Sequence, residues 1–90
     1  MVTVKIPTQL RSASEGQAEV QVDGSSVREV LDALFAEHGE LRERIADEDG
    51  SLRRFVNIYV SGEDIRFLDG LDTPVQTGAE LTILPAVAGG

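Results

Sequence analysis

One stretch of the chain repeats its apolar residues at the period of an α-helix, and no other stretch does so over a comparable length. The repeat follows the spacing i, i+3, i+4, i+7 and i+8, which places its members on one face: Val27, Val30, Leu31, Leu34 and Phe35. A chain of 90 residues with one such helix must bury that face against something other than a second long helix.

Both ends of this helix carry recognisable signals. Ser26 and Glu29 have the spacing of a capping box, in which the hydroxyl accepts from an exposed amide and the carboxylate reaches back. Gly39 is expected to end the helix in the left-handed conformation, with His38 near the negative end of the helix dipole. The signals therefore predict a helix that begins after Ser26 and ends at about His38.

Apolar and polar residues alternate on both sides of this helix, as in half-buried strands. Five segments are predicted as strands: 2–6, 18–22, 55–60, 65–67 and 81–84. The first two are expected to form an antiparallel hairpin around an exposed loop, and a short second helix is expected over 40–47. Turns are expected at 23–25, 47–50 and 61–64, with an irregular segment over 68–77.

The order of these elements predicts an α+β fold of the β-grasp, or ubiquitin-like, class. In it a mixed sheet of four to five strands is covered on one face by one main helix. A ferredoxin-like fold would need a second long helix, and residues 40–47 are too short and too weakly periodic for one. We expect a single β-grasp domain over residues 1–85, followed by a flexible C-terminal tail over residues 86–90.

The last ten residues, Leu81 to Gly90, are the longest uncharged run of the chain. Pro85 cannot donate a ladder hydrogen bond, so the final strand is expected to stop there. Pro85 and the residues that follow are predicted to bind a partner as a tail that enters its cleft: Ala86, Val87, Ala88, Gly89 and Gly90. Five extended residues at about 3.3 Å each reach roughly 16 Å, far enough to carry the terminal carboxylate away from the domain.

The two glycines at the end favour a functional tail over a frayed one. They carry no side chain, so other atoms can approach them closely in a narrow channel. Frayed tails are usually polar, and this tail is not. The sequence therefore predicts that the Gly90 carboxylate is the reactive group of the protein.

Composition excludes several classes of function. The net charge of −8 argues against nucleic-acid and membrane partners and favours steering toward basic proteins. The chain has no cysteine and one histidine, His38, so we expect no disulfide, no bound cofactor, no metal site and no independent enzyme. With no signal peptide or membrane-spanning run in view, we expect a cytoplasmic protein that is a monomer on its own.

Two further groups of residues could bind a partner. Phe67 and Leu68 lie in an irregular stretch, where a docking patch and a place in the core are equally compatible with the sequence. Arg54 and Arg66 could bind an acidic partner, although surface ion pairs are the more common role of such residues.

Several stretches resemble the ThiS/MoaD group of bacterial sulfur carriers, and most closely its branch that serves a cysteine-forming pathway. The stretches are residues 54–60 (RFVNIYV), 63–67 (EDIRF) and 82–90 (TILPAVAGG), with a weaker likeness over 2–7. The resemblance spans the chain and is most specific over 54–90.

The resemblance implies that the protein is a co-substrate of other enzymes. An E1-like activating enzyme of the MoeB/ThiF type would use ATP to adenylate Gly90, and a sulfur donor would displace AMP to leave a thiocarboxylate. A PLP-dependent synthase would then accept the sulfur, and a zinc-dependent peptidase would restore the Gly-Gly end. Thiosugar and thiazole synthesis are other destinations that the resemblance allows.

Two alternatives use the same tail. A MoaD-like protein would be the small subunit of molybdopterin synthase, and a ubiquitin-like modifier would join Gly90 to lysine side chains. A third possibility is an interaction domain whose tail only plugs a larger subunit. The residues quoted do not choose among these roles.

Overall fold

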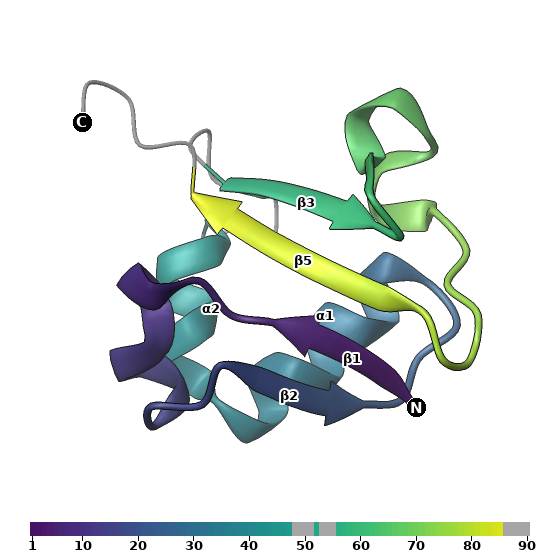
Figure 1. Ribbon diagram of the computed structural model, residues 1–90. Coiled ribbons are helices and arrows are strands. Elements are labelled where there is room, and N and C mark those ends of the chain that lie inside the picture. The colour runs from purple at the N-terminus through teal and green to yellow at the C-terminus, as the bar shows by residue number, and fades with distance from the viewer. Residues whose placement is uncertain (48–51, 53–55, 86–90) are drawn as a thin grey trace.

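The fold is a single mixed sheet with one helical layer, as Figure 1 shows. The computed structural model describes residues 1–47, 52 and 56–85. Its sheet has the strand order β2-β1-β5-β3-β4. The strands are β1 (Val2–Lys5), β2 (Glu19–Val22), β3 (Val56–Val60), β4 (Glu63–Asp64) and β5 (Glu80–Pro85).

The sheet brings the two ends of the chain side by side. β1 pairs antiparallel with β2 and parallel with β5, so the first and last strands are neighbours at the centre. β3 pairs antiparallel with both β5 and β4. The predicted mixed sheet and the predicted hairpin of the first two strands are both confirmed.

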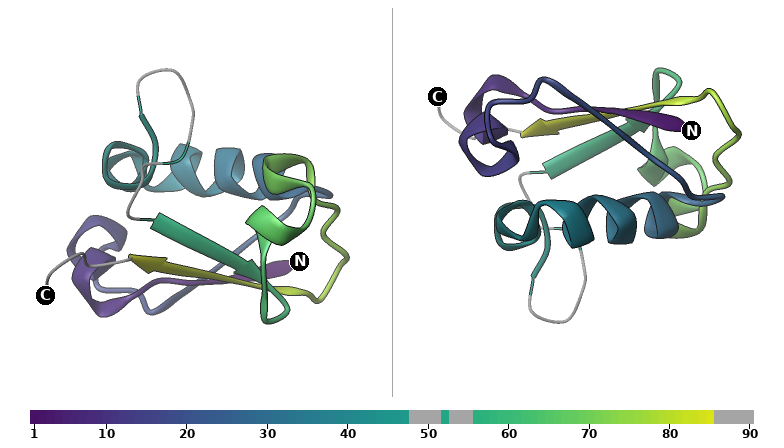
Figure 2. Two further views of the ribbon diagram at one scale, coloured as in Figure 1. Left: turned by 90° about the horizontal axis from the view of Figure 1, so that it is seen from above. Right: turned by 90° about the horizontal axis from the view of Figure 1, so that it is seen from below.

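Two helices, α1 (Val27–Glu37) and α2 (Gly39–Ile45), lie on the same face of the sheet, and Figure 2 shows this layer from both sides. The predicted apolar stripe faces the sheet. Its members Val27, Val30, Leu31 and Leu34 are buried, and Phe35 is partly buried against the same core. They meet the inward side chains of the strands, and each fully buried large apolar residue contributes about 1.5–3 kcal/mol.

The start of α1 matches the predicted capping box with one shift. The backbone N–H of Glu29 donates to the Ser26 hydroxyl over 3.2 Å. The Glu29 carboxylate reaches back, but it accepts from the backbone N–H and the hydroxyl of Ser25, at 3.2 and 3.0 Å. Gly24 precedes them, and a Cβ at this position would lie 2.7 Å from the Val30 backbone nitrogen, so the helix approaches as closely as glycine allows.

The predicted end of α1 is correct in position and wrong in mechanism. The helix stops at His38, whose φ and ψ are −131° and 79°. Gly39 does not adopt the left-handed conformation and instead begins α2. Leu41 and Ile45 of α2 are fully buried, so the helical layer continues because the second segment has its own apolar contacts with the core.

The segment predicted as an exposed loop after the first strand is in fact a 3-10 helix, η1 (Thr8–Ser14). Leu10, Ala13 and Ser14 within it are buried. Leu10 and Ala13 are three residues apart and therefore share a face, which closes one end of the core. The polar residues around them hid this short apolar face.

The predicted strand over 65–67 is also wrong. These residues form a second 3-10 turn, η2 (Ile65–Phe67), and the segment after it contains a third, η3 (Gly70–Asp72). A short strand, β4, occupies part of the predicted turn at 61–64. Phe55, Arg54 and most of the predicted turn at 47–50 lie outside the described residues.

Across the described ranges, no helix has both the length and the apolar character needed to span a bilayer. The longest, α1, has 11 residues.

Candidate functional site

The last strand is held firmly up to the point where the tail begins. β5 has a hydrogen-bonded neighbour on each side, β1 and β3. Leu81 and Ile83, which alternate along it, are fully buried. A strand anchored on both edges and on its inner face gives whatever follows it a fixed origin and direction.

The strand ends at Pro85, as predicted. Pro85 is the register partner of Val56, the first residue of β3, so it stands at the end of the described β3–β5 ladder. Its missing N–H removes the donor that a longer ladder would need. Ala86, Val87, Ala88, Gly89 and Gly90 lie outside the described residues, and their roles stay predictions.

Leu84 is a residue that the sequence reasoning missed. Its side chain is 45% exposed and lies directly before Pro85. Leu84 follows the buried Ile83, so strand alternation turns it to the face away from the helices. Alternation from Leu81 and Ile83 is the signal that would have identified it, since it makes Leu84 the apolar residue on the wrong face.

A second apolar feature lies on η2. Phe67 is 86% exposed and Leu68 is 40% exposed, so a place in the core is excluded for both. Ile65, the first residue of the same turn, is buried. The turn therefore packs into the core through Ile65 and exposes the aromatic ring of Phe67 to solvent.

Asp64 and Arg66 fix the turn that carries Phe67. The Asp64 carboxylate accepts from the Arg66 backbone N–H at 2.9 Å and from its guanidinium at 2.8 Å. These hydrogen bonds, the side-chain bond first, hold the pKa of Asp64 below its ordinary value. The carboxylate in turn raises the pKa of Arg66. Arg66 thus forms an ion pair, as expected, and the Asp64 side chain in that pair is only 7% exposed.

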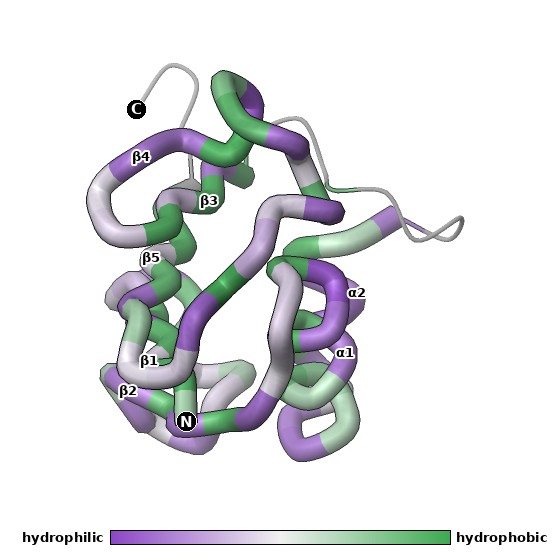
Figure 3. Tube along the Cα trace, turned by 90° about the vertical axis from the view of Figure 1, so that its right-hand side faces the viewer, coloured by the Kyte–Doolittle hydropathy of each residue, from purple (hydrophilic) through white to green (hydrophobic). Residues whose placement is uncertain are grey.

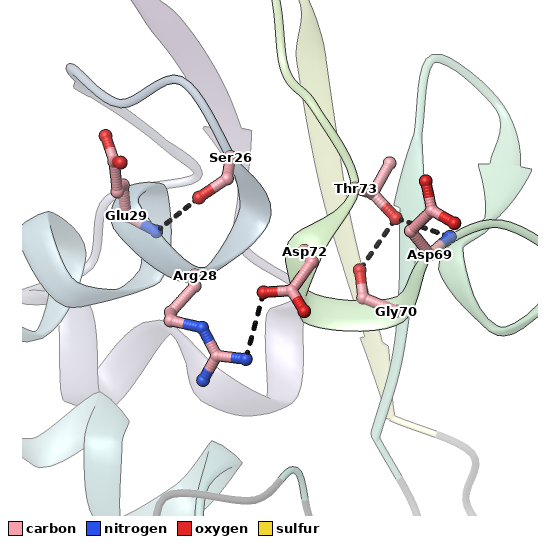
Figure 4. Close-up of polar contacts among 7 residues, drawn as sticks. All are labelled: Ser26, Arg28, Glu29, Asp69, Gly70, Asp72 and Thr73. Carbon is pink, nitrogen blue, oxygen red and sulfur yellow. Dashed lines mark hydrogen bonds and ion pairs between the residues drawn. The ribbon is translucent and has the colours of Figure 1, made fainter.

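The residues after Phe67 are tied to one another and to α1, as Figure 4 shows. The Thr73 hydroxyl donates to the Gly70 carbonyl at 2.7 Å and accepts from the Asp69 backbone N–H at 3.1 Å. Asp72 pairs with Arg28 of α1 at 3.2 Å. The backbone N–H of Val27 donates to the Thr73 carbonyl at 3.0 Å. Residues 64–73 therefore form a fastened loop.

The end of β5 at Pro85 and the turn η2 that carries Phe67 lie at opposite ends of the β3–β5 pair, as the ribbon in Figure 1 shows for these elements. Pro85 faces the start of β3, whereas Leu81 faces Val60 at its end, and β4 and η2 follow from there. The length of β3 alone separates the two ends by roughly 13 Å. Among the predicted site residues that the structure describes, Pro85 therefore lies apart from Arg66, Phe67 and Leu68.

The described side chains offer little for catalysis. No cluster of three or more His, Cys, Asp or Glu that could hold a metal occurs among residues 1–47, 52 and 56–85. His38 lies at the junction of α1 and α2, which fits the structural role expected for it.

A model of the ThiS family matches residues 4–90. The chain belongs to the ThiS family. It is also 48% identical over 91 residues to the sulfur carrier protein CysO of Mycobacterium tuberculosis, with 99% of this chain and 98% of the relative covered. The resemblance to the ThiS/MoaD carriers, and to their CysO branch in particular, is confirmed.

Solved structures give the same relationship. A chain of the BexX/CysO complex of Amycolatopsis orientalis has a TM-score of 0.92 and 46% identity, with both chains fully covered at 100%. SAMP1 of Haloferax volcanii has a TM-score of 0.80 and 31% identity, covering 99% of this chain and 98% of that one. The predicted β-grasp fold is therefore shared with both carriers and small archaeal modifiers.

Proposed function

We propose that this protein is a sulfur carrier that transports sulfur as a thiocarboxylate on Gly90. The observation that carries the proposal is that the family match runs through residue 90, so the likeness to sulfur carriers includes the chain end. The near-complete coverage of CysO at 48% identity supports the same role. The chain itself is a substrate protein, and the bond-making steps belong to its partner enzymes.

Activation is required because a carboxylate is a poor electrophile. An E1-like enzyme joins a Gly90 oxygen to the α-phosphate of ATP and releases pyrophosphate. A sulfur donor then forms a C–S bond as the C–O bond to AMP breaks, so AMP leaves and a thiocarboxylate remains. The chain's own contribution is positional, since β5 holds the tail root at Pro85 and the narrow Gly-Gly end allows close approach.

The carried sulfur serves a cysteine-forming reaction in this proposal. A PLP-dependent synthase would present a serine derivative whose side-chain oxygen carries a leaving group. The thiocarboxylate sulfur would form a C–S bond to the side-chain carbon as the bond from that carbon to the oxygen breaks and the leaving group departs. A zinc-dependent peptidase then cleaves the product and restores the Gly90 carboxylate. The CysO likeness supports this destination, whereas thiosugar synthesis uses the same carried sulfur with a different acceptor.

The experiment is thiocarboxylate formation followed by intact mass. The carrier is incubated with the E1-like enzyme of the same organism, ATP and sulfide, and its mass is expected to rise by the replacement of one oxygen with sulfur. A carrier with an amidated C-terminus and a carrier with one added residue serve as controls, and neither is expected to react. An unchanged mass, under conditions in which Mycobacterium tuberculosis CysO is converted, would contradict the proposal.

A second candidate function is protein modification, which the likeness to SAMP1 favours. The activated Gly90 would then acylate lysine amines and form isopeptide bonds. Chains of the protein on itself would have to begin at Lys5, the only lysine in the sequence, which is paired with Glu80 at 3.5 Å. Gly90-linked lysine conjugates recovered from cells during sulfur sufficiency would support this role.

A further inference from the structure

The side chain of Phe67 leaves a large apolar surface in solvent, so it forgoes the free energy that its burial would contribute to folding. Phe67 has the largest exposed fraction among the large hydrophobic side chains of the described residues, and Leu68 beside it is also exposed. Figure 3 shows the loop after β4 as alternating hydrophobic and hydrophilic residues at the top of the molecule. Adjoining apolar side chains left in solvent can mark a protein-binding surface, and aromatic residues including Phe are enriched at such interfaces.

The loop beneath this ring is ordered before any partner arrives. Asp64 and Arg66 hold η2 from one side through hydrogen bonds of 2.8 and 2.9 Å. Thr73 holds η3 from the other side, and the Arg28–Asp72 pair ties it to α1. A partner that binds Phe67 therefore loses little free energy to ordering the loop, which is the benefit of preorganisation.

Acidic residues lie close to Phe67 along the chain. Glu63 on β4 is exposed, and so are Asp69 and Asp72, of which Asp72 is paired with Arg28. Arg66 is the loop's cation, and its charge is paired with Asp64. A binding pocket complementary to this surface is apolar at its centre and lined at its rim by Arg or Lys side chains.

The choice of partner follows from the chemistry of the tail. Before activation, the Gly90 carboxylate is chemically like the C-terminus of any other protein, so the activating enzyme must select the carrier by its folded body. Enzymes that act later can recognise the thiocarboxylate itself. The fastened loop, roughly 13 Å or more from the tail root, can be gripped while the tail extends into an active site.

We propose that Phe67 and Leu68, together with the nearby acidic residues Glu63 and Asp69, are the surface by which the E1-like activating enzyme selects this carrier, through an apolar pocket with a basic rim. This inference rests on the proposed function. It goes beyond that function because it assigns selection to the loop of residues 64–73, away from the tail.

The first test is steady-state kinetics of thiocarboxylate formation with the activating enzyme of the same organism. Phe67→Ser is expected to raise KM for the carrier about 30-fold, as loss of a hot-spot aromatic residue does, with kcat within about twofold. Phe67→Tyr keeps the ring and is expected to retain most of the affinity. Because Phe67 is exposed, thermal unfolding of both variants should match that of the parent.

The second test separates local from overall charge. Asp69→Lys and Glu19→Lys change the net charge equally, but Glu19 lies on β2 at the far edge of the sheet. Asp69→Lys is expected to raise KM several-fold at low salt, with a smaller effect at high salt, whereas Glu19→Lys is expected to leave KM nearly unchanged.

The outcomes distinguish this inference from the proposed function. If the parent protein forms no thiocarboxylate, the proposed function fails. If the parent reacts and Phe67→Ser has an unchanged KM, only the assignment of this surface fails. A KM effect confined to the sulfur-accepting synthase, with activation unaffected, would equally overturn it.

Discussion

The two ends of the β3–β5 pair differ in how the chain leaves them. At the end marked by Pro85 the ladder stops, because proline provides no further donor, and the uncharged tail follows. At the other end the chain turns through β4 and η2 and is fastened by Asp64 and Thr73. The described chain reaches Pro85 at one end of the pair, and hydrogen bonds fasten it at the other end.

The difference matches the two tasks of a carrier. A reactive group that must enter several active sites benefits from a thin tail with little side-chain bulk. A surface that must be recognised benefits from a shape that is fixed before binding. The same short sheet serves both tasks because its two ends are structurally independent beyond their shared core.

The largest expected effect comes from a substitution that disrupts the core shared by both ends and unfolds the domain. Leu31→Asp would place a charge against the sheet, at a position that is 3% exposed, and should cost several kcal/mol, enough to unfold a small domain. Loss of the cooperative transition in urea, followed by circular dichroism, is the measurement.

The control for this change is the next residue along α1. Asp32 is exposed, so Asp32→Ala should change the free energy of unfolding by no more than about 0.5 kcal/mol. A folded Leu31→Asp protein would show that the helical stripe is not what holds the two ends in one domain.

A smaller effect is expected when only the loop of residues 64–73 is weakened. Thr73→Val keeps the side-chain shape but removes the hydroxyl that accepts from Asp69 and donates to Gly70. Thr73 is 5% exposed, so leaving these groups unsatisfied should cost about 1–3 kcal/mol in the free energy of unfolding.

Thr77→Val, at an exposed position in the same region, is the matched control and should be nearly neutral. Thiocarboxylation at saturating carrier concentration should be unchanged in Thr73→Val, because this substitution leaves the end of β5 at Pro85 untouched. A fall in kcat as large as the fall in stability would show that the two ends are not independent.

The smallest effect concerns the ionisation of Asp64. Its pKa is lowered in the folded protein, chiefly by the side-chain hydrogen bond from Arg66, so the pair stabilises the fold above the ordinary Asp pKa of 3.8. This stabilisation is lost as the pH falls from that value through the lower folded-state pKa. Asp64→Asn should therefore reduce the urea midpoint at neutral pH and converge toward the parent in strong acid.

The matching variant for this prediction is Arg66→Gln, which removes the partner and keeps the carboxylate. Arg66→Gln should make the urea midpoint less dependent on pH over the same acidic range. A parent profile that does not differ from either variant between neutral pH and strong acid would contradict a stabilising role for the pair.

Much of the fold was predictable because its signals are local. The apolar stripe of α1, the Ser26 cap and the stop at Pro85 each depend on residues that are near one another in the sequence. The errors at Gly39 and over η1 have a common cause. A glycine can end or begin a helix, and the short 3-10 helix η1 buries two apolar side chains without a visible sequence period. Contacts with the core decided the structure in both places.

The sequence by itself determined that one apolar helix must cover a sheet and that an uncharged tail must follow Pro85. Only the tertiary structure decided which apolar residues are left in solvent. Phe35 and Phe67 are equally hydrophobic, yet Phe35 packs against the core and Phe67 is turned away from it. Burial depends on contacts between residues far apart in the chain, as in the core cluster against which Phe35 packs.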